Sequence, residues 1–63
     1  MTKFKVKYRI VESGNPKRVL LSTSVRIVQA ASEMNAVIEV KKLQAAYLKS
    51  RNGELEVISV ESA

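Results

Sequence analysis

Four cations stand at alternate positions near the start of the chain, namely Lys3, Lys5, Lys7 and Arg9. Alternate side chains of a β-strand point to the same face, so a strand here would carry a row of positive charge. Such a row suits the phosphates of a nucleic acid, where release of counterions supplies affinity, or the carboxylates of an acidic protein. The spacing therefore indicates recognition of a polyanion.

A second β-rich stretch, from Arg18 to Val28, is expected to extend this cationic face. Its larger apolar residues fall mainly on one parity, interrupted by Thr23, and we expect that parity to face the core. The apolar set is Val19, Leu21, Val25 and Ile27, and the polar set on the open face is Arg18, Ser22, Ser24 and Arg26. The predicted polyanion-binding residues are thus Lys3, Lys5, Lys7, Arg9, Arg18 and Arg26.

Two observations limit this interpretation. The aromatic residues Phe4, Tyr8 and Tyr47 all fall on predicted core faces, whereas readers of single-stranded nucleic acid present aromatic side chains for base stacking. Glu54 and Glu56 would lie beside the end of the first strand and pair with its cations. Binding of a phosphate backbone or of an acidic protein stays open, as does a cationic face that serves solubility alone.

Groups that carry catalysis or bind metals are scarce. The chain has no His and no Cys, which excludes zinc-finger sites, thiolate nucleophiles and histidine-assisted serine chemistry. Its acidic residues are all Glu and are dispersed along the sequence. Gly14 and Gly53 are isolated turn glycines rather than a phosphate-binding loop. We expect no enzyme, no cofactor and no metal site.

The spacing of the apolar residues changes along the sequence, and these changes predict the strands and the helix that would position the cationic row. Residues 3–12 alternate strictly and predict a two-faced strand with Phe4, Val6, Tyr8 and Ile10 in the core. Turn residues at 13–16 predict a hairpin to the second strand. Residues 33–51 contain no Gly or Pro and carry an apolar stripe at helical spacing, and residues 54–61 read as a third strand.

Local signals mark the ends of the helix. Ser32 suits an N-cap, and Asn52-Gly53 supplies residues that tolerate a left-handed stop. The order is then β-β-α-β, an α+β fold in one domain over residues 1–63. We predict a three-stranded antiparallel sheet in the order 2-1-3, with one helix packed on one face, because a right-handed crossover places the third strand beside the first. The competing order is 1-2-3.

A second set of residues is predicted to contact a partner or another protomer. Ile38 and Lys42 lie on the flank of the helix away from the core, and Glu39 is placed to pair with Lys42. The core of so small a chain is marginal, so a homodimer would supplement it. Its candidate surface is Ile58, Val60, Leu20 and Val11.

Length, charge and hydropathy indicate where in the cell the protein is expected. The chain has 63 residues and a net charge of +5. No stretch approaches the ~18–20 apolar residues of a membrane span, and the alternating N-terminus does not resemble a signal peptide. We expect a cytoplasmic protein that does not contact membranes.

The segment Ala30-Ala31-Ser32-Glu33-Met34-Asn35-Ala36 leads from a strand into the helix, and residues 54–60 close the fold. This arrangement resembles the A-x-S/T-x-x-x-A helix start and closing strand of many small phage-encoded proteins, among them an inhibitor of host RNA polymerase. The similarity covers about half of the chain, which differs from that inhibitor in its longer helix and greater positive charge. The resemblance implies an accessory protein that acts by binding, located in the bacterial host cytoplasm.

Three functions follow as expectations. The first is nucleic-acid binding through the cationic face, with weak sequence selectivity. The second is a phage-type regulator or inhibitor that binds an acidic host protein, for example a polymerase or nuclease. The third is a structural or dimerisation module.

Overall fold

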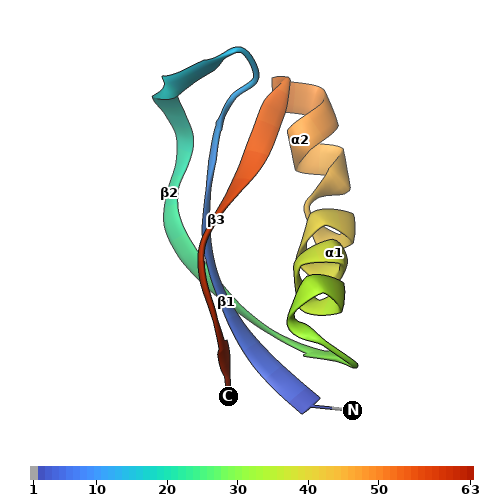
Figure 1. Cartoon of the computed structure of the whole chain (residues 1–63). Helices are drawn as coiled ribbons and strands as arrows, with labels where there is room; N and C mark the ends of the chain where they lie inside the picture. The colour runs from blue at the N-terminus through green and yellow to red at the C-terminus, as the bar shows by residue number, and fades with distance from the viewer. Residues whose placement is uncertain (1) are drawn as a thin grey trace.

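The computed structural model describes residues 2–63, and its elements follow one another in the order β1, β2, α1, α2 and β3. The strands form one antiparallel sheet in the order β2-β1-β3, and both helices lie on one face of it (Figure 1). The bounds are Thr2–Glu12 for β1, Asn15–Ala30 for β2, Glu33–Leu43 for α1, Ala45–Arg51 for α2 and Gly53–Ser62 for β3. The predicted α+β class and the 2-1-3 order are confirmed.

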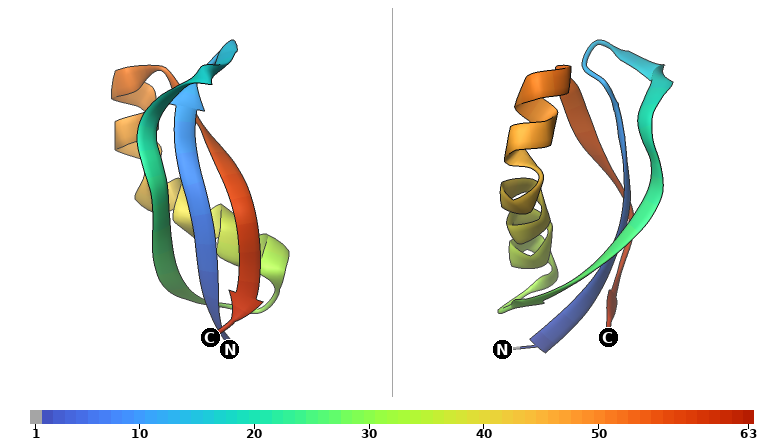
Figure 2. Two further views of the ribbon diagram at one scale, coloured as in Figure 1. Left: turned by 90° about the vertical axis from the view of Figure 1, so that its left-hand side faces the viewer. Right: turned by 180° about the vertical axis from the view of Figure 1, so that it is seen from behind.

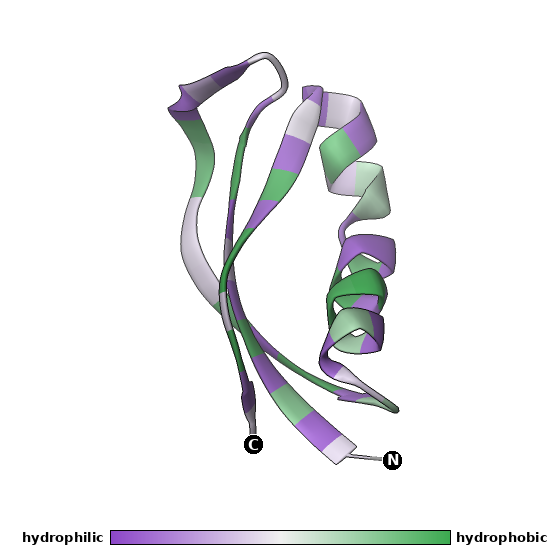
Figure 3. Cartoon of the chain, in the orientation of Figure 1, coloured by the Kyte–Doolittle hydropathy of each residue, from purple (hydrophilic) through white to green (hydrophobic). Residues whose placement is uncertain are grey.

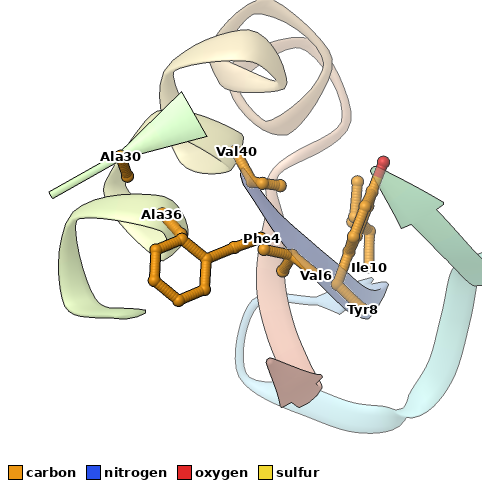
Figure 4. Packing of buried hydrophobic residues seen from close by; sticks show 7 residues of the cluster. All are labelled: Phe4, Val6, Tyr8, Ile10, Ala30, Ala36 and Val40. Atoms are coloured by element: carbon orange, nitrogen blue, oxygen red, sulfur yellow. The ribbon is translucent and has the colours of Figure 1, made fainter. Parts of the chain in front are cut away.

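The core is a layer of side chains between the central strand β1 and the helices (Figure 4). The alternation of apolar and charged residues along β1 is visible as alternating bands in Figure 3. Val6 and Ile10 are 0% exposed, so this face of β1 is sealed from solvent. The buried cluster consists of Phe4, Val6, Tyr8, Ile10, Ala30, Ala36 and Val40.

The predicted helix forms over 33–51 but is divided at Gln44. Gln44 has φ −99° and ψ 5°, outside the regular helical region, although its N–H still donates to the carbonyl of Val40 at 3.0 Å. Its side-chain amide donates to the hydroxyl oxygen of Tyr8 at 2.9 Å. Since neither Gly nor Pro lies nearby, we attribute the bend in Figure 2 to this tie between the helix and the central strand.

The helical segment begins and ends as predicted. The hydroxyl of Ser32 accepts from the N–H of Asn35 at 3.2 Å, which makes it the N-cap. Asn52 takes the left-handed conformation, with φ 52° and ψ 48°. A Cβ on the following Gly53 would lie 2.8 Å from Cγ2 of Ile10, so only glycine lets β3 start this close to the core.

β2 does not keep a single alternation, which corrects the predicted faces of its residues. Ile10 lies opposite Leu21, whereas Tyr8 lies opposite Ser24, so β2 has one extra residue in this interval. Beyond such a bulge, each side chain lies on the face opposite to the one that strict alternation would give it. Beyond the bulge the helix-facing residues are Ser24, Arg26 and Val28, and the residues on the other face are Val25 and Ile27.

β3 has a similar irregularity, because Ile58 is an extra residue between those opposite Lys7 and Tyr8. Strict alternation predicts Val60 on the same exposed face as Ile58. The bulge returns Val60 to the helix side, where it packs against the buried cluster, so its predicted exposure is wrong. Ile58 itself is 47% exposed.

Two further residues of the predicted dimer surface are covered at least in part by the fold itself. Val11 is buried at 2% exposure, and Leu20 packs against the buried cluster. The carbonyl of Leu20 also accepts from the hydroxyl of Tyr47 at 3.2 Å, which holds this part of β2 against α2. Of the predicted dimer surface, Ile58 alone is exposed.

Candidate functional site

The open face is the side of the sheet that the helices do not cover, and the left view of Figure 2 looks onto it. Its centre is the lysine row, which we define as Lys3, Lys5 and Lys7 of β1. The three side chains stand two residues apart, roughly 7 Å along the strand. All three residues are exposed, and no ion pair among residues 2–63 includes them.

Two of the predicted binding cations already have acidic partners. Nε of Arg9 donates to Oε1 of Glu56 at 2.6 Å, across the β1–β3 pairing. Nη1 of Arg18 lies 3.2 Å from Oε2 of Glu12, at the hairpin end of the sheet. The pairing of Glu56 with the end of the first strand is confirmed, and the carboxylate of Glu56 offsets the charge of Arg9 on the open face.

Arg26 is on the wrong face for the predicted site. Its pairing partner in β1 is Val6, whose side chain points to the helices, so Arg26 also projects to that side. The bulge in β2 is the physical reason, because it reverses the parity that the sequence indicates. Arg26 is exposed nevertheless, since β2 is an edge strand.

On the open face, Val25 and Ile27 occupy the positions that the sequence predicts for Arg26, Ser22 and Ser24. Val25 lies opposite Lys7 and Ile27 opposite Lys5, and they are 49% and 61% exposed. Alternation along the sequence predicts both residues in the core. The interruption by Thr23 was the signal of a phase change, but alternation alone does not locate a bulge.

β3 contributes acidic residues to the other margin of the open face. Glu61 lies opposite Lys5 in the register and Glu54 lies opposite Val11. The open face therefore has an apolar margin on β2, the lysine row in the middle and an acidic margin on β3. The two margins differ, because the β2 side offers two exposed apolar side chains and no carboxylate, whereas the β3 side combines Ile58, 47% exposed, with Glu54 and Glu61.

A groove separates the end of β2 from one flank of α1. It has a volume of about 410 Å³ and is lined by Gln29, Ala30, Ala31, Asn35, Ile38, Glu39 and Lys42. The predicted pair of Glu39 and Lys42 is present at 3.6 Å. Ile38 is 42% exposed, so the two residues predicted from the helix flank, Ile38 and Lys42, lie together beside this groove.

Two further features of the described part of the chain concern its acidic and its buried polar groups. Among residues 2–63 no group of three or more His, Cys, Asp or Glu side chains is placed to hold a metal ion. In the same range every buried side-chain nitrogen or oxygen has a hydrogen-bond partner. Neither described helix has the length and apolarity that crossing a membrane requires.

Comparisons with protein-family models, with curated proteins and with solved structures found no match for this chain. The resemblance to small phage proteins stays a prediction. Function is therefore inferred from the chemistry of the open face.

Proposed function

We propose that this chain is a non-enzymatic binding domain whose open face recognises an acidic segment of a partner protein. The observation that carries the proposal is the juxtaposition of the lysine row with Val25 and Ile27 on the neighbouring strand. A small regulator or inhibitor, such as a phage accessory protein acting on a host enzyme, would bind its target through a surface of this kind.

Both parts of the surface bear on the class of partner. Exposed, unpaired lysines attract carboxylates and increase the rate of encounter. Exposed apolar side chains add affinity when apolar groups cover them, at about 25 cal/mol per Å² of buried area. A phosphate backbone offers little apolar area, whereas a protein segment that mixes acidic and apolar residues complements both parts.

A second copy of this chain complements the open face less well. Because β1 is the central strand, two copies packed open face to open face about a two-fold axis would bring one lysine row against the other. Like charges in contact across an interface are unfavourable. We therefore propose a different protein as the partner.

Selection of peptides tests the proposal, because it does not require the partner to be identified first. A random dodecapeptide library is selected on the immobilised chain, and enriched peptides are expected to combine carboxylates with apolar residues. The variant Lys5→Glu with Lys7→Glu should bind the enriched peptides about tenfold more weakly or worse. Enrichment of peptides without acidic residues would contradict the proposal.

A matched variant separates a local surface from general charge. Lys41→Glu with Lys49→Glu changes two exposed helix residues and gives the same net charge, 5 − 4 = +1. This control should keep its affinity within about twofold, because the changed residues lie outside the open face. An equal loss of affinity in both variants would indicate unspecific attraction and would contradict the assignment to the open face.

Nucleic-acid binding is a second candidate function, supported by the net charge of +5 and by the absence of ion pairs to the lysine row among residues 2–63. Three lysines on phosphates predict a slope of roughly −3 in log affinity against log salt for duplex DNA. Val25→Ser with Ile27→Ser discriminates the candidates. It should leave duplex binding unchanged if phosphates are the target, and weaken peptide binding if a protein is.

A further inference from the structure

The direction in which the N–H and C=O groups of β1 point determines the direction of the same groups in the paired strand β2. The carbonyl of Lys3 accepts from the N–H of Ala63 at 2.9 Å, so the backbone groups of Lys3 point toward β3. These groups alternate in direction along an antiparallel strand. Those of Phe4, Val6 and Tyr8 therefore point toward β2, and the residues that face them across the pairing are Val28, Arg26 and Ser24.

The intervening residues of β2 consequently turn their N–H and C=O groups to the outside. These residues are Val25, Ile27 and Gln29, and within residues 2–63 β2 pairs with β1 alone. The outer edge of β2 thus combines unpaired backbone groups with the exposed apolar side chains of Val25 and Ile27. Gln29 continues the edge into the groove beside Ile38.

This edge lacks the usual protection against pairing. Natural edge strands commonly carry several charged residues or a proline. From Val19 to Ala30, β2 has no proline, and Arg26 is its only charged residue. The edge is therefore suited to accept an extended segment from another chain.

The charges around the edge indicate what that segment contains. β2 has no carboxylate, the lysine row lies on the next strand, and Arg26 belongs to no ion pair among residues 2–63. A residue paired directly with Arg26 would contact it on the helix side, and its neighbours would lie on the open face beside Val25 and Ile27. The complementary sequence is a carboxylate between two apolar residues.

We propose that the acidic partner segment binds as an added β-strand along the outer edge of β2, with a carboxylate opposite Arg26 and apolar residues opposite Val25 and Ile27. This inference rests on the proposed function and adds a contact to it: the carboxylate opposite Arg26 lies on the helix side of the sheet, whereas other carboxylates of the same segment meet the lysine row on the open face. One end of the added strand reaches the groove lined by Ile38 and Lys42.

Backbone methylation of the enriched peptide tests strand addition directly. The peptide is synthesised with N-methyl groups on alternate residues, in two versions of opposite phase. Because alternate amides of a strand face the same neighbour, one version should lose binding by about tenfold or more and the other should bind like the unmodified peptide. Equal binding by both versions would overturn strand addition.

A proline variant tests the same edge from the side of the protein. Ile27→Pro removes an outward N–H and no bond of the β1–β2 ladder, and should weaken peptide binding about tenfold. Ile27→Thr keeps the N–H and should bind within a few-fold of the original chain. Full affinity of a folded Ile27→Pro would overturn the proposal, and if this variant does not fold, the methylated peptides decide.

Two outcomes separate this inference from the proposed function. Loss of affinity in the Lys5→Glu, Lys7→Glu variant, with no effect of methylation, would keep the acidic partner and overturn strand addition. Amide protection of Val25 and Ile27 that rises with protein concentration in the absence of peptide would show that a second copy covers the edge. That result would overturn the assignment to a different protein.

Discussion

The two faces of β1 differ although their residues alternate along one strand. On the helix face, Val6 and Ile10 are fully buried, and Tyr8 is tied to the helix through Gln44. On the open face, Lys5 and Lys7 are exposed and lie outside the three ion pairs found among residues 2–63. Over residues 3–7, folding therefore depends on one face of this strand and leaves the other face free for binding.

The largest expected loss of stability comes from a substitution on the helix face of β1. Ile10→Ala removes a side chain with no exposed surface and should lower the free energy of unfolding by about 2–5 kcal/mol. Chemical denaturation measures this loss. Lys7→Ala is the control on the open face. If it lowered the free energy of unfolding by more than about 1 kcal/mol, the open face would also contribute to folding, which would contradict the difference between the two faces.

The second largest effect is expected where β3 meets the core. Gly53→Ala would bring a Cβ to 2.8 Å from Cγ2 of Ile10, and this overpacking should cost about 1–3 kcal/mol of unfolding free energy. Gly14→Ala offers a comparison, since a Cβ there meets nothing within 4 Å and only its φ of 82° is strained. Denaturation in which Gly53→Ala is as stable as the original chain would show that the approach of β3 to Ile10 is looser than described.

A smaller effect is expected at the tie between β1 and the helices. Tyr8→Phe removes the acceptor of the 2.9 Å hydrogen bond from Gln44 and should cost about 0.5–1.5 kcal/mol. Helical structure at Gln44 should become more regular, which amide chemical shifts report. Unchanged shifts at Gln44 would contradict our explanation of the bend.

The smallest effect on stability is expected at the acidic margin of the open face. Glu56→Gln breaks the ion pair with Arg9, whose side chain is 39% exposed, so the free energy of unfolding should fall by less than about 1 kcal/mol. The released arginine adds a cation to the open face, so affinity for acidic peptides should rise. A fall in that affinity would contradict electrostatic attraction of acidic peptides to this face, because the substitution makes the face more positive.

The fold was largely predictable because its signals are local and regular. Alternation in residues 3–10, the N-cap at Ser32 and the stop at Asn52 each depend on a few neighbouring residues. The division of the helix at Gln44 was not predictable, because it depends on contact with Tyr8, 36 residues earlier in the chain.

The candidate site was predictable only on β1. The lysine row follows from alternation in an unbroken strand, whereas Arg26 and Val60 lie beyond bulges in β2 and β3. A bulge of one residue reverses the face to which every later side chain points. The position of the bulge is set by pairing with the neighbouring strand rather than by local composition. The exposed apolar margin of Val25 and Ile27 was missed for that reason.

Stability and affinity, both measured on the variant Lys5→Glu with Lys7→Glu, give the decisive test of the open face as a binding surface. The free energy of unfolding should stay within about 1 kcal/mol of that of the original chain, a margin that includes the like charges which Lys5→Glu places opposite Glu61. Affinity for the selected acidic peptide should fall about tenfold or more. Unchanged affinity in a variant of unchanged stability would contradict the claim that the open face of β1 is the binding surface.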